Sequence, residues 1–321
     1  MLQMANLRST QKHCCHHQVA SLLKASPVPP GKKYVLANEG RVAALVAKAF
    51  VKFAKKVVKA LSKSLPKPTA DKADLSRLIK AERTVEDIIK AVLDEIDLDG
   101  FSTSLAEELV PELVKAFEAG GLSGLDLVGV RNDRAMVELV PQDAVDYAKQ
   151  RAAELVGKTY DKETKTFVDN PNPAYSITDT TRDGIRDLTS QALEQGWSAG
   201  ELEANVTEAY AFSDARSETI ARTELAKAHV QGNVKAWSNT GRVKGKSWLL
   251  ADTHPEDDEC DDAADEGIIA LDELFEATGE DGPPAHPNCL CALVPELIGE
   301  DDSEKAALTS LNPLRAMRLA N

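Results

Sequence analysis

The sequence has few aromatic residues, few cysteines and no long apolar run. Aromatic residues make up 5% of the 321 residues, which argues against a surface that binds nucleic acid by stacking its bases. No run of about 18 uninterrupted apolar residues occurs, so no segment is predicted to cross a bilayer. Five cysteines are too few for a disulfide-stapled scaffold. The first 17 residues have no apolar stretch after their basic residues, and we therefore expect no secretory signal.

The net charge of −14 is distributed unevenly along the chain. Residues 1–80 hold 16 Lys and Arg against 3 Asp and Glu, whereas the remainder holds 22 against 49. The first part therefore carries +13 and the second −27. This asymmetry predicts a basic interaction arm joined to an acidic body, and the acidic body argues against a general nucleic-acid-binding protein.

A cationic amphipathic helix is predicted over residues 41–65. Its apolar residues recur at helical spacing, and its other side carries lysines at six positions: Lys48, Lys52, Lys55, Lys56, Lys59 and Lys63. Three interpretations fit: a membrane-surface helix, an arm that faces nucleic-acid phosphates, and a helix docked on a partner protein with a solvated basic face. The prolines at positions 27, 29 and 30, together with Gly31, are expected to interrupt regular structure before this helix.

Helical periodicity continues to residue 239, and two short strands follow it. Gly120 and Gly121 are expected to end a helix and to open a glycine-rich loop, and Pro141 is expected to begin the next helix. Ser198 is a predicted N-cap with Glu201 at the capping-box position. Helices are predicted over 71–96, 104–117, 141–157, 179–196, 198–210 and 214–238, a polar linker over 158–177, and strands over 243–251 and 291–298.

A cluster of cysteine and histidine residues lies between the two predicted strands. Cys260, His286, Cys289 and Cys291 are the soft or borderline donors that tetrahedral Zn²⁺ requires, and His254 is a fifth candidate that could replace one of the paired cysteines. We therefore predict a structural zinc ion. In the alternative, one of the paired cysteines is a small buried apolar residue and His286 bonds to the backbone.

A zinc hydrolase or deaminase is the alternative from another functional class. His254 and Glu256, followed by Cys289 and Cys291, are similar to the HxE…PCxxC signature of zinc deaminases, in which the glutamate shuttles protons. The cysteine spacing is one residue short, however, and the acidic run over 256–262 would repel a nucleic-acid substrate. No other catalytic motif occurs, so we predict that the protein is not an enzyme.

An ordered series of landmarks runs through the second half of the chain. IARTE at 220–224 continues as LAKAHVQGNVKAW and is followed by Gly241, Trp248, Asp252, Cys260 and the segment PPAHPNCLCALVP. Together with the lead-in TDTTRDGIRDLTSQALEQGWSAGEL, this series resembles the phage Mu protein-F-like family over roughly residues 140–297. These are minor head, or head-morphogenesis, proteins of tailed bacteriophages. Many members have a CxxC where this chain has Cys260 and Ala263, which shifts the expected ligands toward His286 or His254.

The resemblance implies a structural virion protein in few copies. It would act with the portal protein and other capsid proteins during head assembly, and in DNA packaging or ejection. Its place would be the capsid interior or the portal neighbourhood of the virion, and the host cytoplasm during assembly. There the basic arm would meet packaged double-stranded DNA or an acidic portal surface, whereas membrane contact is not favoured.

Arg222 and Glu224 belong to the resembling run. They are two positions apart and therefore do not share one helical face. We assign no reaction to them and expect separate salt bridges to neighbouring helices.

The predicted fold is mainly α, with a small α+β zinc-binding module near the C-terminus. The chain is divided into a basic N-terminal arm (1–68), a helical N-terminal domain (69–135), a Mu-F-like domain that ends in the Cys/His module (136–299) and a tail (300–321).

Overall fold

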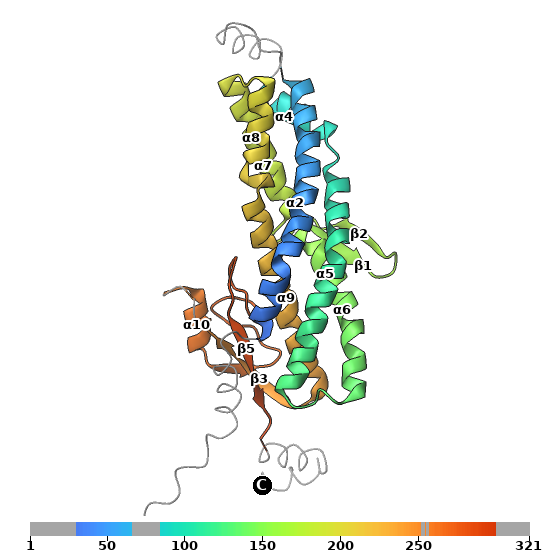
Figure 1. Ribbon diagram of the computed structural model, residues 1–321, viewed down its shortest axis with the longest axis vertical. Helices are drawn as coiled ribbons and strands as arrows, with labels where there is room; N and C mark the ends of the chain where they lie inside the picture. The colour runs from blue at the N-terminus through green and yellow to red at the C-terminus, as the bar shows by residue number, and fades with distance from the viewer. Residues whose placement is uncertain (1–29, 66–83, 252–253, 255–256, 300–321) are drawn as a thin grey trace, which may run out of the picture. The chain divides into compact units, whose positions relative to one another are not determined.

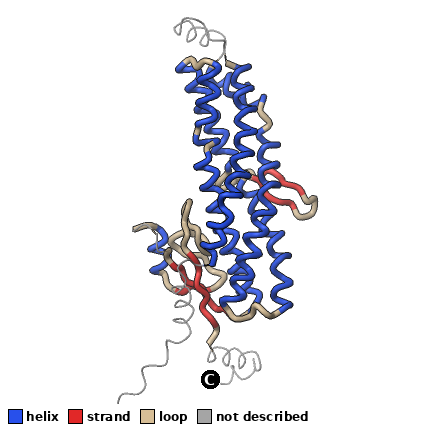
Figure 2. Tube along the Cα trace, viewed as in Figure 1, coloured by secondary structure: helices blue, strands red, loops and turns tan. Residues whose placement is uncertain are grey.

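The computed structural model describes residues 30–65, 84–251, 254 and 257–299. These residues are mainly helical, as predicted, and their few strands form two small sheets (Figures 1 and 2). They divide into two compact units, each built from separate segments of chain. We call residues 34–117 and 141–228 the helical unit, and residues 118–140 and 229–299, with 30–33, the C-terminal unit. No described helix is both long and apolar enough to cross a membrane.

The helices are long, and several contribute residues to both units. They are α2 (Pro30–Ser64), α4 (Val85–Glu95), α5 (Leu98–Leu127), α6 (Arg134–Leu155), α7 (Ile177–Gln195), α8 (Ala199–Glu208), the 3-10 helix η1 (Tyr210–Phe212), α9 (Asp214–Thr240) and α10 (Glu259–Asp265). The units are therefore interleaved along the chain, whereas the four predicted segments are consecutive. Those segments stay a prediction.

Helix α2 buries its apolar stripe inside the helical unit. Phe53 stacks on Phe101 of α5 with ring centroids 4.2 Å apart, and Phe50 meets Phe212 of η1 edge-on at 6.5 Å. The helix begins at Pro30, so the expectation that the prolines and Gly31 exclude regular structure up to Arg41 was wrong at this end. Proline is compatible with the first turn of a helix because the amide hydrogen that it lacks has no partner there.

Capping residues set several helix ends as the sequence predicts. The side chain of Ser198 accepts a hydrogen bond from the backbone N–H of Glu201, and the Glu201 carboxylate accepts one from the backbone of Ser198, which completes the predicted capping box of α8. Gly196 ends α7 in the left-handed conformation. The part of the predicted helix 71–96 that precedes residue 84 lies outside the described residues.

Helix α5 runs through Gly120 and Gly121, where the sequence predicted a helix end and a loop. A Cβ atom on Gly120 would lie 1.9 Å from the carbonyl oxygen of His229 in α9, and one on Gly124 would lie 3.0 Å from the Cα of Asn233. The glycines thus allow two helix backbones to approach closely and are not helix breakers here. Helix α6 likewise contains Pro141 in its interior and does not begin there.

The helical unit also contains a β-hairpin where the sequence predicted a polar linker. Strands β1 (Lys158–Asp161) and β2 (Thr166–Asp169) pair in antiparallel register. The side chain of Asp161 accepts hydrogen bonds from the backbone N–H groups of Glu163 and Thr164, which closes the turn. The hairpin is largely exposed, so its strands lack the alternation of apolar and polar residues that would have identified them.

The C-terminal unit packs a three-stranded antiparallel sheet against α10 and the ends of longer helices. The strand order is β4–β3–β5, and β3 (Val243–Leu249) and β5 (Ala292–Leu297) confirm the two predicted strands. Strand β4 (Ile268–Ala270) was not predicted because it has only three residues. The core is built around Trp237, Trp248 and Phe275, and it includes the three cysteines of the Cys/His cluster. This arrangement gives the predicted α+β module.

Candidate metal centre and neighbouring surfaces

Three short elements of the C-terminal unit bring the cysteines together. Cys260 lies in the first turn of α10, whose N-cap Asp258 accepts a hydrogen bond from the Cys260 N–H at 2.8 Å. Cys289 and Cys291 precede β5. Asn288 has a positive φ of 65°, and the N–H of Cys289 donates to the carbonyl of His286 at 3.2 Å. This turn lets both cysteines of the CxC pair point inward, and all three sulfur-bearing residues are buried free cysteines.

The sulfur geometry fits a metal ion of the size of zinc. The Sγ atoms of Cys260 and Cys289 are 3.7 Å apart. Two thiolates bound tetrahedrally to one Zn²⁺ at about 2.3 Å would lie roughly 3.8 Å apart. Candidate ligand atoms lie within 4.8 Å of one another in three sets. Two of them share Cys260: His254 with Cys260 and Cys291, and His286 with Cys260 and Cys289; the third joins His254 to Asp258 and Asp261. Each of the four other predicted ligands therefore lies close to Cys260.

The two histidines differ in what their ring nitrogens contact. Nε2 of His254 is 2.9 Å from Oδ2 of Asp261, and its Nδ1 is buried with no hydrogen-bond partner among the described residues. Nδ1 of His286 lies 3.0 Å from the carbonyl oxygen of Pro287, and its Nε2, 3.2 Å from a carboxylate oxygen of Asp258, is likewise buried with no hydrogen-bond partner among the described residues. The side chain of His254 is 8% exposed against 26% for His286. Each histidine thus has one ring nitrogen next to an oxygen acceptor and the other buried without a hydrogen bond, which is the arrangement of a metal ligand. The lower exposure of the His254 side chain favours His254.

The thiol acidities indicate how much negative charge this pocket tolerates without a cation. Hydrogen bonding from the Cys289 side chain lowers the pKa of Cys291 to about 6. Burial raises the pKa of Cys260 to about 12, and contact with Cys291 raises the pKa of Cys289. Three thiolates cannot share a buried site unless a cation compensates them, and a bound Zn²⁺ would deprotonate all three. The donor set therefore fits zinc.

The acidic residues around the cluster were not predicted as part of it. In the sequence they belong to the acidic run over 256–262, and in the structure Asp258 and Asp261 contact the two histidines and also cap α10. Their spacing is that of a capping box, and this pattern could have identified them. Glu256, the proposed proton shuttle of the enzyme alternative, lies outside the described residues.

The predicted lysine stripe lies on the exposed side of α2. All six side chains are exposed, and Lys63 forms an ion pair with Glu95. The opposite, apolar side is buried in the helical unit, as Phe50 and Phe53 show. A membrane-surface helix would need that side for lipid, so this interpretation was wrong for the folded chain. The helix is docked on its own protein with a basic face that is open to solvent.

Arg222 and Glu224 each form an ion pair with a different helix. The guanidinium of Arg222 donates to both carboxylate oxygens of Glu39 in α2, at 2.6 and 3.0 Å. Glu224 accepts from Arg151 of α6 at 2.8 and 2.9 Å, and its side chain is only 7% exposed. The two residues thus link α9 to two neighbouring helices inside the helical unit. The sequence analysis expected such separate salt bridges. Their partners Glu39 and Arg151 carry no sequence pattern that would have identified them.

Comparison with known proteins identifies the region that contains these features. Residues 183–294, about a third of the chain, match the family described as phage Mu protein F like protein. No curated protein and no solved structure shows significant similarity to the chain. The matched region contains all five candidate metal ligands together with Arg222 and Glu224. The match confirms, over residues 183–294, the predicted resemblance to the phage Mu protein F-like family.

Proposed function

We propose that this protein is a head-morphogenesis protein of a tailed bacteriophage, present in few copies and acting with the portal protein and other capsid proteins. The family match over residues 183–294 carries this proposal. The protein would belong to the virion, in the capsid interior or near the portal, and would occupy the host cytoplasm during assembly. It would contribute contacts and not catalysis, because the cluster has enough protein donors to close a metal coordination shell.

The composition of assembled heads tests this proposal. Quantitative mass spectrometry of purified particles should find the chain at a few copies for each particle. Affinity capture of the tagged chain from infected cells should recover the portal protein of the same phage, and capture with the tag alone should not. Particles without the chain, and normal head yield after deletion of its gene, would contradict the proposal.

The Cys/His cluster would hold a structural zinc ion through Cys260, Cys289, Cys291 and one histidine, for which His254 is favoured because its side chain is the less exposed of the two. Four protein donors leave no open coordination position for a substrate. The ion would cross-link α10 to the segment before β5. That link stabilises a module whose small sheet buries little apolar surface.

Metal analysis tests the zinc site. Protein purified under reducing conditions should contain about one zinc ion for each chain, since structural zinc binds tightly. Cys289→Ser should lose the metal, whereas the double variant Cys14→Ser/Cys15→Ser, which leaves Cys260, Cys289 and Cys291 in place, should keep it. His254→Ala should weaken zinc binding more than His286→Ala. Less than about 0.2 zinc per chain in the wild type would refute the site.

The structural role and the enzyme alternative predict different results for the variant Glu256→Gln. Because we assign this side chain no chemistry, Glu256→Gln should leave both zinc content and head assembly unchanged. A zinc-dependent deamination or hydrolysis that disappears in Glu256→Gln would contradict the structural role.

The lysine stripe of α2 would contact the phosphates of packaged double-stranded DNA. Among the described residues, Lys48, Lys52, Lys55, Lys56 and Lys59 form no ion pair, so their charges are available to a polyanion. Such contacts do not depend on the DNA sequence. Each adds roughly 0.9 to the magnitude of the slope of log binding constant against log salt concentration.

Charge removal tests this contact better than deletion does, because deletion of residues 1–66 would remove the buried face of α2. Replacing Lys52, Lys55 and Lys59 with Gln should lower DNA affinity and reduce the salt dependence by about 2–3. Lys162→Gln/Lys165→Gln on the β1–β2 hairpin, which removes two charges, is the control. An equal effect of both variants would show that the stripe is not the contact surface.

A further inference from the structure

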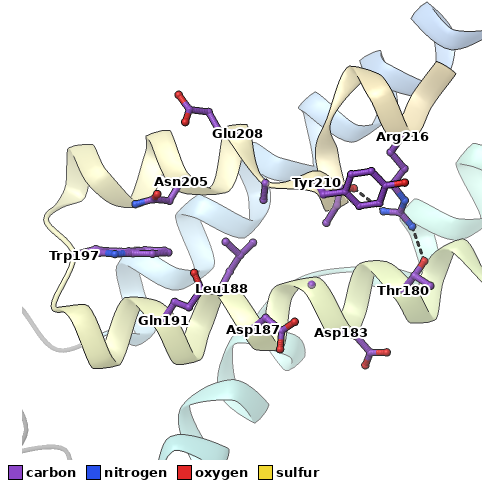
Figure 3. Close-up of a pocket in the computed structure, with 13 residues that line it drawn as sticks. Thr180, Asp183, Asp187, Leu188, Gln191, Trp197, Asn205, Glu208, Tyr210 and Arg216 are labelled. Atoms are coloured by element: carbon purple, nitrogen blue, oxygen red, sulfur yellow. Dashed lines mark hydrogen bonds between the residues drawn. The ribbon is translucent and has the colours of Figure 1, made fainter. Parts of the chain in front are cut away.

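A groove of about 600 Å³ lies in the helical unit between α7, α8 and η1 (Figure 3). Trp197 stands at one end of it and Tyr210 at the other. Leu188 and Ala211 are buried residues of its apolar lining. A Cβ atom on Gly184 would lie 2.8 Å from the Cβ of Ala211, so the glycine lets η1 pack directly on α7. None of the roles proposed above uses this groove.

The groove carries net negative charge. Asp183 and Asp187 flank it on the α7 side and Glu208 on the α8 side, as Figure 3 shows. All three carboxylates are exposed, and none forms an ion pair with a residue that the structure describes. The one cation in the lining, Arg216, is buried beneath the Tyr210 end. Its guanidinium donates to the carbonyl of Ala211 at 2.6 Å and to three further oxygens of α7, so four of its five N–H groups are already used.

Two aromatic rings and two amides complete the lining. Tyr210 is 67% exposed, which is high for a large aromatic side chain. Trp197 is half-buried, and its indole N–H donates to Oε1 of Gln195 at 3.1 Å. The ring faces attract cations and contact methylene groups, and the amides of Gln191 and Asn205 offer additional acceptor oxygens.

The walls of the groove limit the kind of ligand. They are helices, whose backbone N–H and C=O groups bond within the helix, so an extended peptide would find few main-chain partners there. Recognition therefore depends on carboxylates, rings and apolar floor. The volume lies in the range of small-molecule sites.

We propose that this groove binds a linear aliphatic polyamine, a chain of methylene segments that separates ammonium groups. The ammonium groups would pair with Asp187 on the α7 side and with Glu208 on the α8 side. The methylene segments would lie against Leu188 and the Trp197 ring. The site is independent of the zinc cluster, of the lysine stripe and of the role in head assembly.

Titration with spermidine tests the site, because Trp197 reports on it. The other two tryptophans, Trp237 and Trp248, are buried in the C-terminal unit. Spermidine should change the tryptophan emission of the full-length protein in a saturable way, and Trp197→Phe should abolish the change. Asp187→Asn and Glu208→Gln should each raise the dissociation constant about two- to five-fold, as expected for exposed charge pairs. Glu194→Gln on α7 and Glu203→Gln on α8 are matched controls that should leave it unchanged.

Three outcomes would overturn the proposal. The first is the absence of a saturable change. The second is an equal change with MgCl₂ at the same ionic strength, or an equal loss in the two control variants, since either would show only screening of the acidic surface. The third is tighter binding of a hexalysine peptide that competes with spermidine, which would make a lysine-bearing protein segment the occupant.

Discussion

Buried charge in the helical unit is compensated pair by pair. Burial opposes the charge on Arg151, but the attraction of Glu224 outweighs it and raises the pKa of the guanidinium. Arg151 also contacts Glu154 at 3.3 Å, and that carboxylate is 44% exposed. One arginine therefore has a buried and an exposed partner, and the two should differ greatly in their contribution to stability.

Replacement of the buried partner should be the costly change. Glu224→Gln leaves the Arg151 charge buried without its counterion and should lower the free energy of unfolding by about 3 kcal/mol or more. Glu154→Gln removes an exposed contact of the same arginine and should cost less than about 1 kcal/mol. Urea unfolding followed by circular dichroism measures both. Equal losses in the two variants would show that burial does not decide the strength of these pairs.

The buried imidazole of His229 should make the stability of the C-terminal unit depend on pH. Burial lowers the pKa of His229 to about 4, whereas an unfolded histidine titrates near 6.5. As the pH falls below about 6.5, His229 is therefore protonated in the unfolded state before it is protonated in the folded state. The free energy of unfolding decreases until the pH reaches the pKa of His229 in the folded protein.

Between pH 7 and pH 5, the difference between the folded and unfolded pKa values of His229 lowers the free energy of unfolding by about 2 kcal/mol. The methionine of His229→Met cannot be protonated. The free energy of unfolding of this variant should therefore decrease less between pH 7 and pH 5 than that of the wild type, by about 2 kcal/mol. Denaturant unfolding at the two pH values measures the difference. Identical pH dependence in both proteins would rule out His229 as the source.

At the scale of the element, glycine has opposite roles in α5 and α2. A Cβ atom on Gly120 would overlap the backbone of α9, whereas one on Gly40 of α2 would have nothing within 4 Å. Both glycines lie inside helices, where alanine is intrinsically favoured over glycine. The same substitution should therefore have opposite signs at the two positions.

Gly120→Ala should destabilise the protein by about 3 kcal/mol, because helix backbones must move apart to admit the methyl group. Gly40→Ala should stabilise it by about 0.5–1 kcal/mol. Thermal and urea unfolding of the two variants, compared with the wild type, measure both effects. A tolerated Gly120→Ala would mean that the close approach of α5 and α9 is not required.

At the scale of the whole molecule, the candidate zinc ligands all belong to one of the two compact units. Removal of a bound ion would leave three buried thiols and two histidines without the cation that links their segments. The helical unit contains none of these ligands among its described residues. Metal removal should therefore act on the C-terminal unit alone.

Chelation of the metal under reducing conditions should lower the free energy of unfolding of the C-terminal unit by about 4 kcal/mol or more if the ion is tightly bound. Hydrogen exchange measures this unit by unit. Backbone protection of β3 and β5 should fall after chelation, while α7 and the α2 residues of the helical unit keep theirs. Restoring zinc should restore the protection. A uniform loss in both units, or none, would contradict the assignment of a structural ion to this module.

Local sequence patterns predicted the elements that depend on nearest neighbours. The apolar stripe of residues 41–65, the capping box of Ser198 and Glu201, and the strands on either side of the cysteines all rest on short-range periodicity or on a cap. The Cys/His cluster was also predictable, since soft donors near one another in sequence have few other uses. Its acidic partners, Asp258 and Asp261, were not predicted, although their capping-box spacing could have identified them.

What the sequence by itself determined is the type of most elements, the candidate ligand set and the family, because each is written in local spacing and residue chemistry. Only the tertiary structure decided that Gly120 and Pro141 lie inside helices, that α2 buries its apolar face in its own protein, and that Glu39 and Arg151 pair with Arg222 and Glu224. The physical reason is the same in each case. Close backbone approach, burial and ion pairing depend on residues far away in the chain, and no local pattern records them.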